Sequence, residues 1–328
     1  MIKFAIYGCG TISRIHAAAL RDVEGAELVA CADLKLAAAE TFARARGIRV
    51  IPDWDALLCD EEVDGVCVCT PSGTHAQLAI EALKAGKHVV LEKPMAITAA
   101  DCDRIIAAAE ESTAKIMVIS QMRTAPDVCR VKALLEEGAF GRLVMCQLHM
   151  CYYRPAEYYQ GSWRGTKAMD GGGALMNQGI HGVDILQHLA GPVKQLRSVV
   201  RTLLHDIEVE DTAVAALEFE SGAVGVITAS TATYPGFDRE VRLYGTRGAA
   251  VIKDEKLVRL ILDGKEESCE AYTSRGTAGT NLLSTHQGHA RQLDAFVRAL
   301  RGEPVGYMDQ YQGKQGVDLI EWIYRESM

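Results

Sequence analysis

The sequence predicts an α/β protein. Its first part is a doubly wound parallel sheet, and its second part is an α+β domain built on a large, mostly antiparallel open sheet. Short apolar runs alternate with helical patterns through residues 1–120. One of these runs, Gly65–Cys69, is wholly apolar, as in a parallel strand covered on both faces. Beyond Gln121, strand patterns are joined by turns such as Glu220-Ser221-Gly222, which suit antiparallel hairpins. We therefore expect two domains, residues 1–120 and 121–328.

The composition excludes several classes of protein. With 328 residues the chain is long for a single hydrophobic core. No apolar run approaches the roughly 18 residues of a membrane span, and the net charge of −8 argues against nucleic acid or acidic membranes as partners. A strand that begins at Ile2 leaves no room for a cleaved signal peptide. We expect a cytoplasmic protein.

The ten cysteines form no C-x-x-C pair, and no His/Cys spacing resembles a zinc site. This predicts reduced core thiols and no bound metal. Cys9 lies inside the first glycine-rich turn and is the thiol to test for sensitivity to oxidation.

The first elements have the order that a dinucleotide site needs. An apolar run at Ile2–Tyr7 predicts a strand, Ile12–Arg21 a helix, and Ala26–Ala32 a second strand. The turn Gly8–Ser13 reads Gly-x-Gly-x-x-Ser, and Asp33 closes the second strand.

Each part of this turn has a physical role. Gly8 allows a sharp turn, and Gly10 has no Cβ, so a pyrophosphate can approach the backbone and the start of the helix. The carboxylate of Asp33 can accept hydrogen bonds from the ribose hydroxyls of NAD and would repel the extra phosphate of NADP. Lys35 softens that preference. The predicted cofactor contacts in the turn are Gly8, Gly10, Thr11 and Ile12.

The remaining elements of the first domain continue the alternation of strands and helices. We expect helices near residues 36–46, 53–58, 74–85 and 99–112, and strands at 49–51, 65–69, 88–91 and 116–119. Right-handed crossovers then place ligands at the carboxyl ends of the strands, where Gly8, Asp33, Thr70 and Glu92 lie.

The segment Thr70–His75 follows one of these strands. It has two compatible interpretations, a turn with a helix N-cap at Thr74 and a loop that passes beneath the cofactor. We therefore count Thr70, Pro71 and His75 as cofactor-binding residues, without a catalytic role for His75.

Glu92-Lys93-Pro94 ends another strand, and both Glu92 and Lys93 are predicted to contact the cofactor. Lys93 could be an ordinary surface lysine at a strand exit. Alternatively, its amine lies near the nicotinamide, where partial burial and the positive ring would depress its pKa and make it a proton acceptor.

The second half reads as a helix followed by many strands. The helix covers about residues 127–137, and strands are expected near 143–153, 196–203, 212–219, 223–231, 239–244 and 249–252. A broad open sheet usually needs a cover, so we expect a homodimer or homotetramer formed through its open face.

The strongest signal of the second half is the segment Gly171–His181. Three glycines lead into a predicted helix on which Asn177 and His181 are four residues apart and share a face. A buried histidine is often only a satisfied core group, but the glycine-rich entry and polar neighbour favour a site role for His181. Asp184 could instead be a structural partner of the helix.

Arginines and aromatic residues gather near this segment. Guanidinium groups and ring faces are suited to a hydroxylated or anionic sugar, although they could also form an ordinary polar rim. The predicted substrate-binding residues are Arg123, Tyr153, Trp163, Arg164, Asn177 and His181.

Together these motifs resemble the Gfo/Idh/MocA oxidoreductase family over nearly the whole chain. The resemblance rests on Gly8–Ser13, Thr70-Pro71, Glu92-Lys93-Pro94, Gln121-x-Arg123, Gly171–His181 and the helices after His289. It implies a Rossmann domain followed by an open-sheet domain, dimers or tetramers, and oxidation of a hydroxyl group of a sugar, inositol or sugar acid. It also implies that Lys93 and His181 are the catalytic pair.

Asn177 departs from the family pattern, in which many members carry aspartate at this position. The version MNQGIH resembles a subgroup that includes dehydrogenases of nucleotide-linked sugar acids. Because asparagine cannot take a proton, it shifts proton transfer to Lys93. The resulting hypothesis is an NAD-dependent dehydrogenase with Lys93 as general base assisted by His181. The alternatives are a non-catalytic NAD-bound sensor and an NAD-dependent glycosidase without net redox change.

Overall fold

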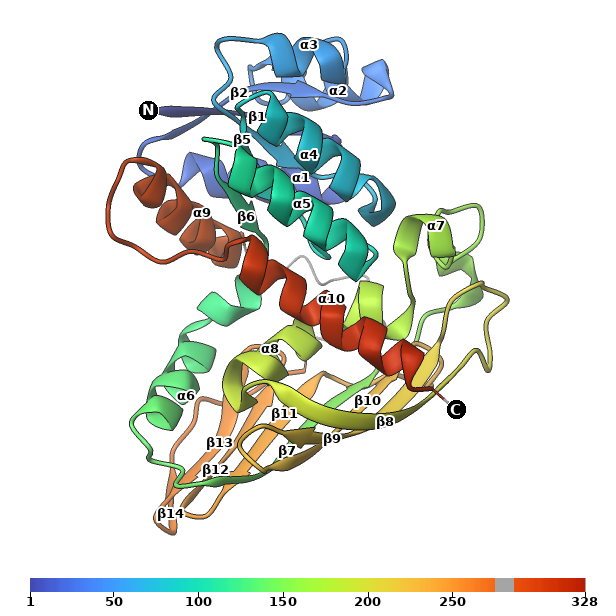
Figure 1. Cartoon of the computed structure of the whole chain (residues 1–328), viewed down its shortest axis with the longest axis vertical. Coiled ribbons are helices and arrows are strands. Elements are labelled where there is room, and N and C mark those ends of the chain that lie inside the picture. Colours follow the sequence, from blue (N-terminus) through green and yellow to red (C-terminus); the bar gives the residue numbers. More distant parts are fainter. Residues whose placement is uncertain (275–285, 328) are drawn as a thin grey trace. The chain divides into compact units, whose positions relative to one another are not determined.

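The computed structural model describes residues 1–274 and 286–327 (Figure 1). The chain forms two compact units. The first contains residues 1–121 and 286–314, and the second contains residues 122–274 and 315–327. Helix α10, Gln310–Arg325, begins in the first unit and ends in the second.

The first unit is built on a six-stranded parallel sheet in the order β3-β2-β1-β4-β5-β6, which confirms the doubly wound prediction. Its strands are β1 (Ile2–Tyr7), β2 (Ala26–Ala32), β3 (Arg49–Val50), β4 (Gly65–Val68), β5 (His88–Leu91) and β6 (Ile116–Val118). Its helices are α1 (Thr11–Arg21), α2 (Leu36–Arg44), α3 (Trp54–Cys59), the 3₁₀ turn Ser72–Thr74, α4 (His75–Lys84), α5 (Ala99–Glu111) and α9 (Gln287–Leu300).

The core of the first unit is formed by side chains of its sheet and of its helices. Phe4 and Ile6 of β1 are fully buried, as are Leu20 of α1 and Phe296 of α9, and α1 packs against α9. Because β2, β1, β4 and β5 are consecutive in the sheet and parallel, the loops after them all leave from the same edge. This edge carries the predicted cofactor contacts.

The second unit is built on an eight-stranded sheet in the order β14-β13-β12-β11-β7-β10-β9-β8. All neighbours are antiparallel except β7 and β10, so the prediction of a mostly antiparallel sheet is confirmed. Its strands are β7 (Leu143–Cys151), β8 (Val193–Arg201), β9 (Thr212–Phe219), β10 (Val224–Ser230), β11 (Glu240–Gly245), β12 (Gly248–Lys253), β13 (Lys256–Leu262) and β14 (Lys265–Glu267). Its helical segments are the 3₁₀ turns Gln121–Thr124 and Ala156–Tyr158, α6 (Pro126–Glu136), α7 (Lys167–Asp170), a π-helix (Ala174–Gly179) and α8 (Ile180–Ala190).

The two faces of this sheet differ. On one face, α8 packs against β7 and β11, and α6 packs against β12 and β13. Alternate residues along the strands point to that face and pack in the core, as Cys146, Leu148 and Ile227 illustrate. On the opposite face, every second residue points outward, and four aliphatic side chains are exposed there. They are Met145, Val199, Val214 and Val224, each exposed by 38–49%.

The helix predicted after the three glycines differs from expectation. Residues Ala174–Gly179 form a π-helix and only then does α8 begin. The carbonyl of Gly173 accepts from the N–H groups of both Asn177 (3.2 Å) and Gln178 (3.3 Å). The buried carboxylate of Glu210 accepts hydrogen bonds from the N–H groups of Gly173 and Leu175, each at 2.8 Å. The prediction that Asn177 and His181 share a face assumed an α-helix, so it does not apply unchanged to this segment. Short π-helical segments are frequent at functional sites.

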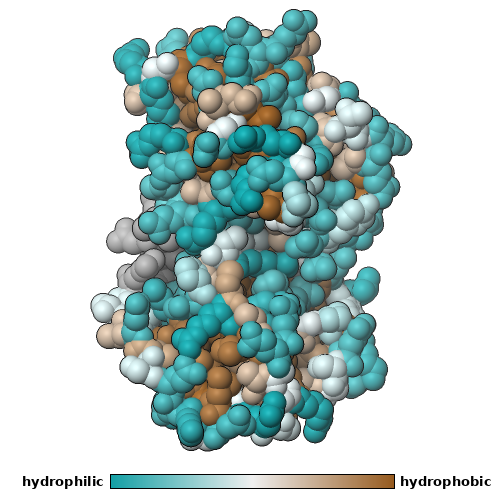
Figure 2. Space-filling model, turned by 90° about the vertical axis from the view of Figure 1, so that its left-hand side faces the viewer, coloured by the Kyte–Doolittle hydropathy of each residue, from teal (hydrophilic) through white to brown (hydrophobic). Residues whose placement is uncertain are grey.

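Within residues 1–274 and 286–327, no helix combines the length and apolar character that crossing a membrane requires. The face shown in Figure 2 is mostly hydrophilic, with smaller hydrophobic areas between the polar residues. All ten cysteines are free thiols.

Candidate active site

The glycine-rich turn between β1 and α1 has the geometry of a phosphate cradle. Gly8 has a φ of +95°, and a Cβ there would lie 2.7 Å from the carbonyl oxygen of Cys69. A Cβ on Gly10 would meet nothing within 4 Å, so the space above it is open. Gly10 is the N-cap of α1, and no side chain caps the helix. The first N–H groups of α1 are thus suited to bind a phosphate.

Asp33 is held in position by backbone groups at the end of β2. One carboxylate oxygen accepts from the N–H of Cys9 (2.7 Å) and the other from the N–H of Lys35 (2.8 Å). Each oxygen retains a lone pair, so the carboxylate can still accept from two hydroxyl groups. The turn and Asp33 therefore fit the diphosphate and the ribose of a dinucleotide.

His75 ties together the two loops that follow β4 and β5. Its ring is buried, with Nε2 3.0 Å from the carbonyl oxygen of Thr70 and Nδ1 2.7 Å from that of Pro94. Burial lowers the pKa of His75, which favours the neutral ring. Thr74 precedes α4 as predicted, but its hydroxyl donates to the carbonyl of Pro71 (2.8 Å) instead of capping the helix.

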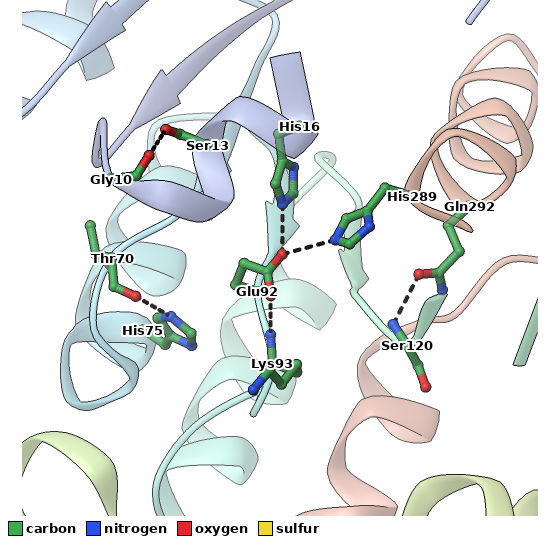
Figure 3. A network of polar contacts seen from close by, with 10 residues as sticks. All are labelled: Gly10, Ser13, His16, Thr70, His75, Glu92, Lys93, Ser120, His289 and Gln292. Carbon is green, nitrogen blue, oxygen red and sulfur yellow. Dashed lines mark hydrogen bonds and ion pairs between the residues drawn. The ribbon is translucent and has the colours of Figure 1, made fainter. Parts of the chain in front are cut away.

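Lys93 follows β5 and is half-buried, with its backbone N–H 3.1 Å from Oε2 of Glu92. The Lys93–Pro94 peptide bond is cis. The side chain of Glu92, predicted to contact the cofactor, is instead turned toward two histidines, His16 and His289 (Figure 3). The sequence did not single out either histidine for a site role.

In the second unit, the predicted substrate residue Arg123 makes a two-pronged ion pair with Asp184. Its Nε and Nη2 donate to the two carboxylate oxygens at 2.8 and 2.5 Å, and both side chains are about nine-tenths buried. This contact gives Asp184 the structural role that the sequence left open. It uses the Nε/Nη2 edge of the Arg123 guanidinium group.

Asn177 has a buried partner that the sequence did not reveal. Its Nδ2 donates to Asp170, which is only 2% exposed and also accepts from the N–H of Gly165 (2.7 Å). The Oδ1 of Asn177 accepts from Gln178 (3.1 Å), so the orientation of the amide is fixed from both sides. Asp170 directly precedes the three glycines, and this position in the sequence could have indicated its contact with Asn177.

Two of the predicted substrate residues, Tyr153 and Arg164, line a cavity of about 590 Å³ within the second unit. Tyr159, His205 and Glu208 also line it. The guanidinium group of Arg164 lies over two rings, 4.8 Å from the centre of Tyr158 and 5.3 Å from that of Trp163. Aromatic rings and a guanidinium group held in one orientation can bind a planar or anionic part of a ligand.

His181 is the second residue of α8 and is half-buried. The π-helix that leads to it is fixed at its start by Glu210, whose carboxylate also accepts from the hydroxyl of Tyr324 (2.8 Å). Burial raises the pKa of Glu210 despite these hydrogen bonds. A backbone held this firmly gives His181 a defined position in the second unit.

Comparison with known proteins agrees with this arrangement. Residues 2–120 match the oxidoreductase family with an NAD-binding Rossmann fold, and residues 128–251 match the GFO/IDH/MocA C-terminal domain. The chain is 26% identical over 308 residues to inositol 2-dehydrogenase of Rhizobium meliloti, covering 91% of this chain and 88% of that protein. It is 32% identical over 233 residues to D-apiose dehydrogenase of Paraburkholderia graminis, covering 70% and 61%.

Among solved structures, the chain resembles the WlbA dehydrogenase of Bordetella pertussis, crystallised with NADH and UDP-GlcNAcA. The identity is 33%, the TM-score is 0.88, and the match covers 99% of this chain and 96% of that one. The chain belongs to the Gfo/Idh/MocA oxidoreductase family. It is an NAD-binding oxidoreductase, as the sequence predicted.

The contact between Asn177 and Asp170 predicts a pH-dependent effect of the substitution Asn177→Asp. Two carboxylates would then meet in a buried place, so one would keep its proton and have a pKa above the value of about 4 in the unfolded chain. A raised folded pKa stabilises below the unfolded pKa, and this stability is lost as the pH rises. We expect the variant to lose about 3 kcal/mol relative to the wild type near neutral pH, and less near pH 4, in urea unfolding curves.

The matched control exchanges the two residues. Asp170→Asn combined with Asn177→Asp restores one amide and one carboxylate, and should recover most of the lost stability. An Asn177→Asp variant whose stability follows the wild-type pH dependence would show that the two side chains are not in contact.

Proposed function

We propose that this protein is an NAD-dependent dehydrogenase that oxidises a ring hydroxyl of a sugar-like substrate. The observation that supports this most directly is the placement of Lys93 in the first unit. Its backbone follows β5, at the sheet edge that also carries the phosphate turn and Asp33. The chain belongs to an NAD-binding oxidoreductase family, and NAD accepts a hydride when it is bound.

In this proposal Lys93 is the general base that removes the hydroxyl proton as the carbon is oxidised. His181 is the second residue that handles the proton, and Asn177 positions the substrate by hydrogen bonds. The fixed orientation of the Asn177 amide supports this role, because a preorganised group orders the substrate without reorganisation.

For the cofactor we propose contacts with Gly8, Gly10, Thr11, Ile12 and Asp33. The uncapped start of α1 and the open space above Gly10 support binding of the diphosphate. The free lone pairs of Asp33 support a preference for NAD over NADP. Thr70, Pro71 and His75 contribute by shaping the neighbouring loop, and Glu92 by holding Lys93.

For the substrate we propose a sugar that carries an anionic group, such as a nucleotide-linked sugar acid. The cavity beside Arg164 supports this class, because it offers a guanidinium group and tyrosine rings to a charged or planar substituent. Tyr153 and Trp163 belong to the same group of residues. The complex of the WlbA relative with UDP-GlcNAcA points to the same chemistry.

We also propose that two copies of the chain associate through the open face of the eight-stranded sheet. The aliphatic residues exposed there form two cross-strand pairs that point outward on the same face, Met145 with Val224 and Val199 with Val214. A second copy would bury them.

Replacing Lys93 by alanine should lower kcat by about 100-fold, the usual contribution of a general base. A substrate is first identified by incubating the protein with NAD and a panel of sugars, inositols, uronates and nucleotide-sugars. The absorbance of NADH measures the turnover. Lys84→Ala, an exposed lysine of α4, is the control and should leave kcat unchanged. Retained turnover in Lys93→Ala removes this residue from the role.

Replacing Arg164 by leucine should raise the KM for an anionic substrate by about 10-fold or more, since a charged hydrogen bond is lost. The KM for the neutral sugar that lacks the anionic group should change little. Arg201→Leu, an exposed arginine on β8, is the matched control. An equal change of KM for both substrates would contradict a role in recognising charge.

Introducing glutamate at Val214 and Val199 should convert the assembly to monomers, because two charges on each copy would be buried in the interface. Light scattering coupled to size-exclusion chromatography measures the mass. Leu203→Glu adds a charge at another exposed aliphatic residue outside the strands and should leave the mass unchanged. A wild-type protein that is already monomeric would refute the proposed interface.

A further inference from the structure

A buried cluster lies directly behind Lys93 in the first unit. Oε1 of Glu92 accepts from Nε2 of His16 at 2.7 Å and from Nε2 of His289 at 3.2 Å (Figure 3). Oε2 of Glu92 accepts from the backbone N–H of Lys93 at 3.1 Å. The three side chains are 0–5% exposed and come from α1, the end of β5 and α9.

The hydrogen bonds define the charge of this cluster. Each histidine must carry its proton on Nε2 to donate to Glu92. Nδ1 of His16 is buried and has no partner within the described residues, so a second proton there would have no acceptor. Burial accordingly lowers the pKa of His16. Burial alone would raise the pKa of Glu92, but the hydrogen bonds from His16 and His289 outweigh it and hold this pKa well below its usual range.

Two histidines and a glutamate could also bind a metal ion, and their ligand atoms lie within 4.8 Å of one another. Ligand atoms around a tetrahedral zinc ion are about 3.3 Å apart, because each lies about 2 Å from the metal. The 2.7 Å separation between His16 and Glu92 is shorter than this and is a direct hydrogen bond. The cluster is therefore best described as a carboxylate held by the ring N–H groups of two histidines.

The backbone around Lys93 is held from both sides. Glu92 accepts from the N–H of Lys93, and Nδ1 of His75 contacts the carbonyl oxygen of Pro94 at 2.7 Å. The peptide groups on both sides of Lys93 are therefore restrained. Catalysis by a general base is sensitive to displacements of about 1 Å, so this restraint has a kinetic consequence.

We propose that His16, Glu92 and His289 are positioning residues that fix the backbone of Lys93 for catalysis. The proposal rests on the proposed role of Lys93 as the base. His16 lies on the helix that starts at the phosphate turn, so its loss would disturb two functions at once. His289, which comes from α9, is the cleaner residue to test.

A pH effect follows from the same hydrogen bonds. Glu92 also faces the thiols of Cys67 and Cys69 on β4 and the ring of His75 on α4. Burial raises the pKa of both thiols and lowers that of His75, so these neighbours stay uncharged near neutral pH. Removing the hydrogen bond from His289 should therefore raise the pKa of Glu92. Protonated Glu92 accepts poorly from Lys93, so acid should break this hydrogen bond at a higher pH than in the wild type.

The test compares His289→Leu with His289→Gln. Glutamine places an N–H donor close to the position of Nε2, whereas leucine has a similar volume and no donor. We expect His289→Leu to lower kcat by about 10-fold, with the KM for NAD within about twofold of the wild type. The carboxyl ¹³C resonance of Glu92 should titrate about one pH unit higher than in the wild type. His289→Gln should retain kcat within about threefold.

Amide hydrogen exchange gives a readout that does not depend on activity. The amide of Lys93 should exchange faster in His289→Leu than in the wild type or in His289→Gln. If His289→Leu does not fold, Glu92→Met replaces it, because methionine has a similar volume and no oxygen that could accept from the N–H of Lys93. Glu92→Met should show the same loss of kcat and the same faster exchange.

Several outcomes would overturn the proposal. These are a wild-type kcat and a wild-type Glu92 titration in His289→Leu, equal damage in His289→Gln, and unchanged exchange of the Lys93 amide. Stabilisation of the wild type, but not of His289→Gln, by one equivalent of Zn²⁺ would also overturn it in favour of a metal site. Retained turnover in Lys93→Ala would instead refute the proposed base, and the exchange data would still report on the hydrogen bonds.

Discussion

A buried carboxylate is costly unless it finds hydrogen-bond donors, and this requirement organises the loops of both units. Glu92 is surrounded by two histidines and the backbone N–H of Lys93. Glu210 takes two backbone N–H groups at the start of the π-helix. Asp211 is fully buried and accepts from the N–H groups of Leu203, Leu204 and His205. In each case one acidic side chain fixes backbone in a loop or at the start of a helical segment.

The same chemistry explains why the predicted site residues occupy firmly held backbone. The loops after β4 and β5 are joined by His75, and the loop after β1 is joined to the end of β2 through Asp33. In the second unit, Asp170 fixes both Asn177 and the N–H of Gly165, next to Arg164. Loops restrained in this way can present polar groups to a ligand without first being ordered, which reduces the entropy lost on binding.

The parts of the fold that local patterns determine could be predicted from the sequence. The apolar strands, the Gly8–Ser13 turn and Asp33 lie close together in the chain, and their order is sufficient to indicate a dinucleotide fold. The partners of Glu92 could not be predicted in this way, because His289 is 197 residues distant. The π-helix depends on Glu210, which follows it by more than thirty residues. The ion pair between Arg123 and Asp184, which are 61 residues apart, also could not be predicted from spacing alone.

The chain passes between its two units three times, because residues 286–314 belong to the first unit although they follow residues of the second. No single cut therefore separates the units. A truncated protein that ended at Gln121 would keep all six strands of the parallel sheet but would lack α9. Glu92 would lose one donor, and α1 would lose the helix that packs against it. Domain exchange within this family, or the recombination of fragments in the laboratory, must transfer the two distant segments together.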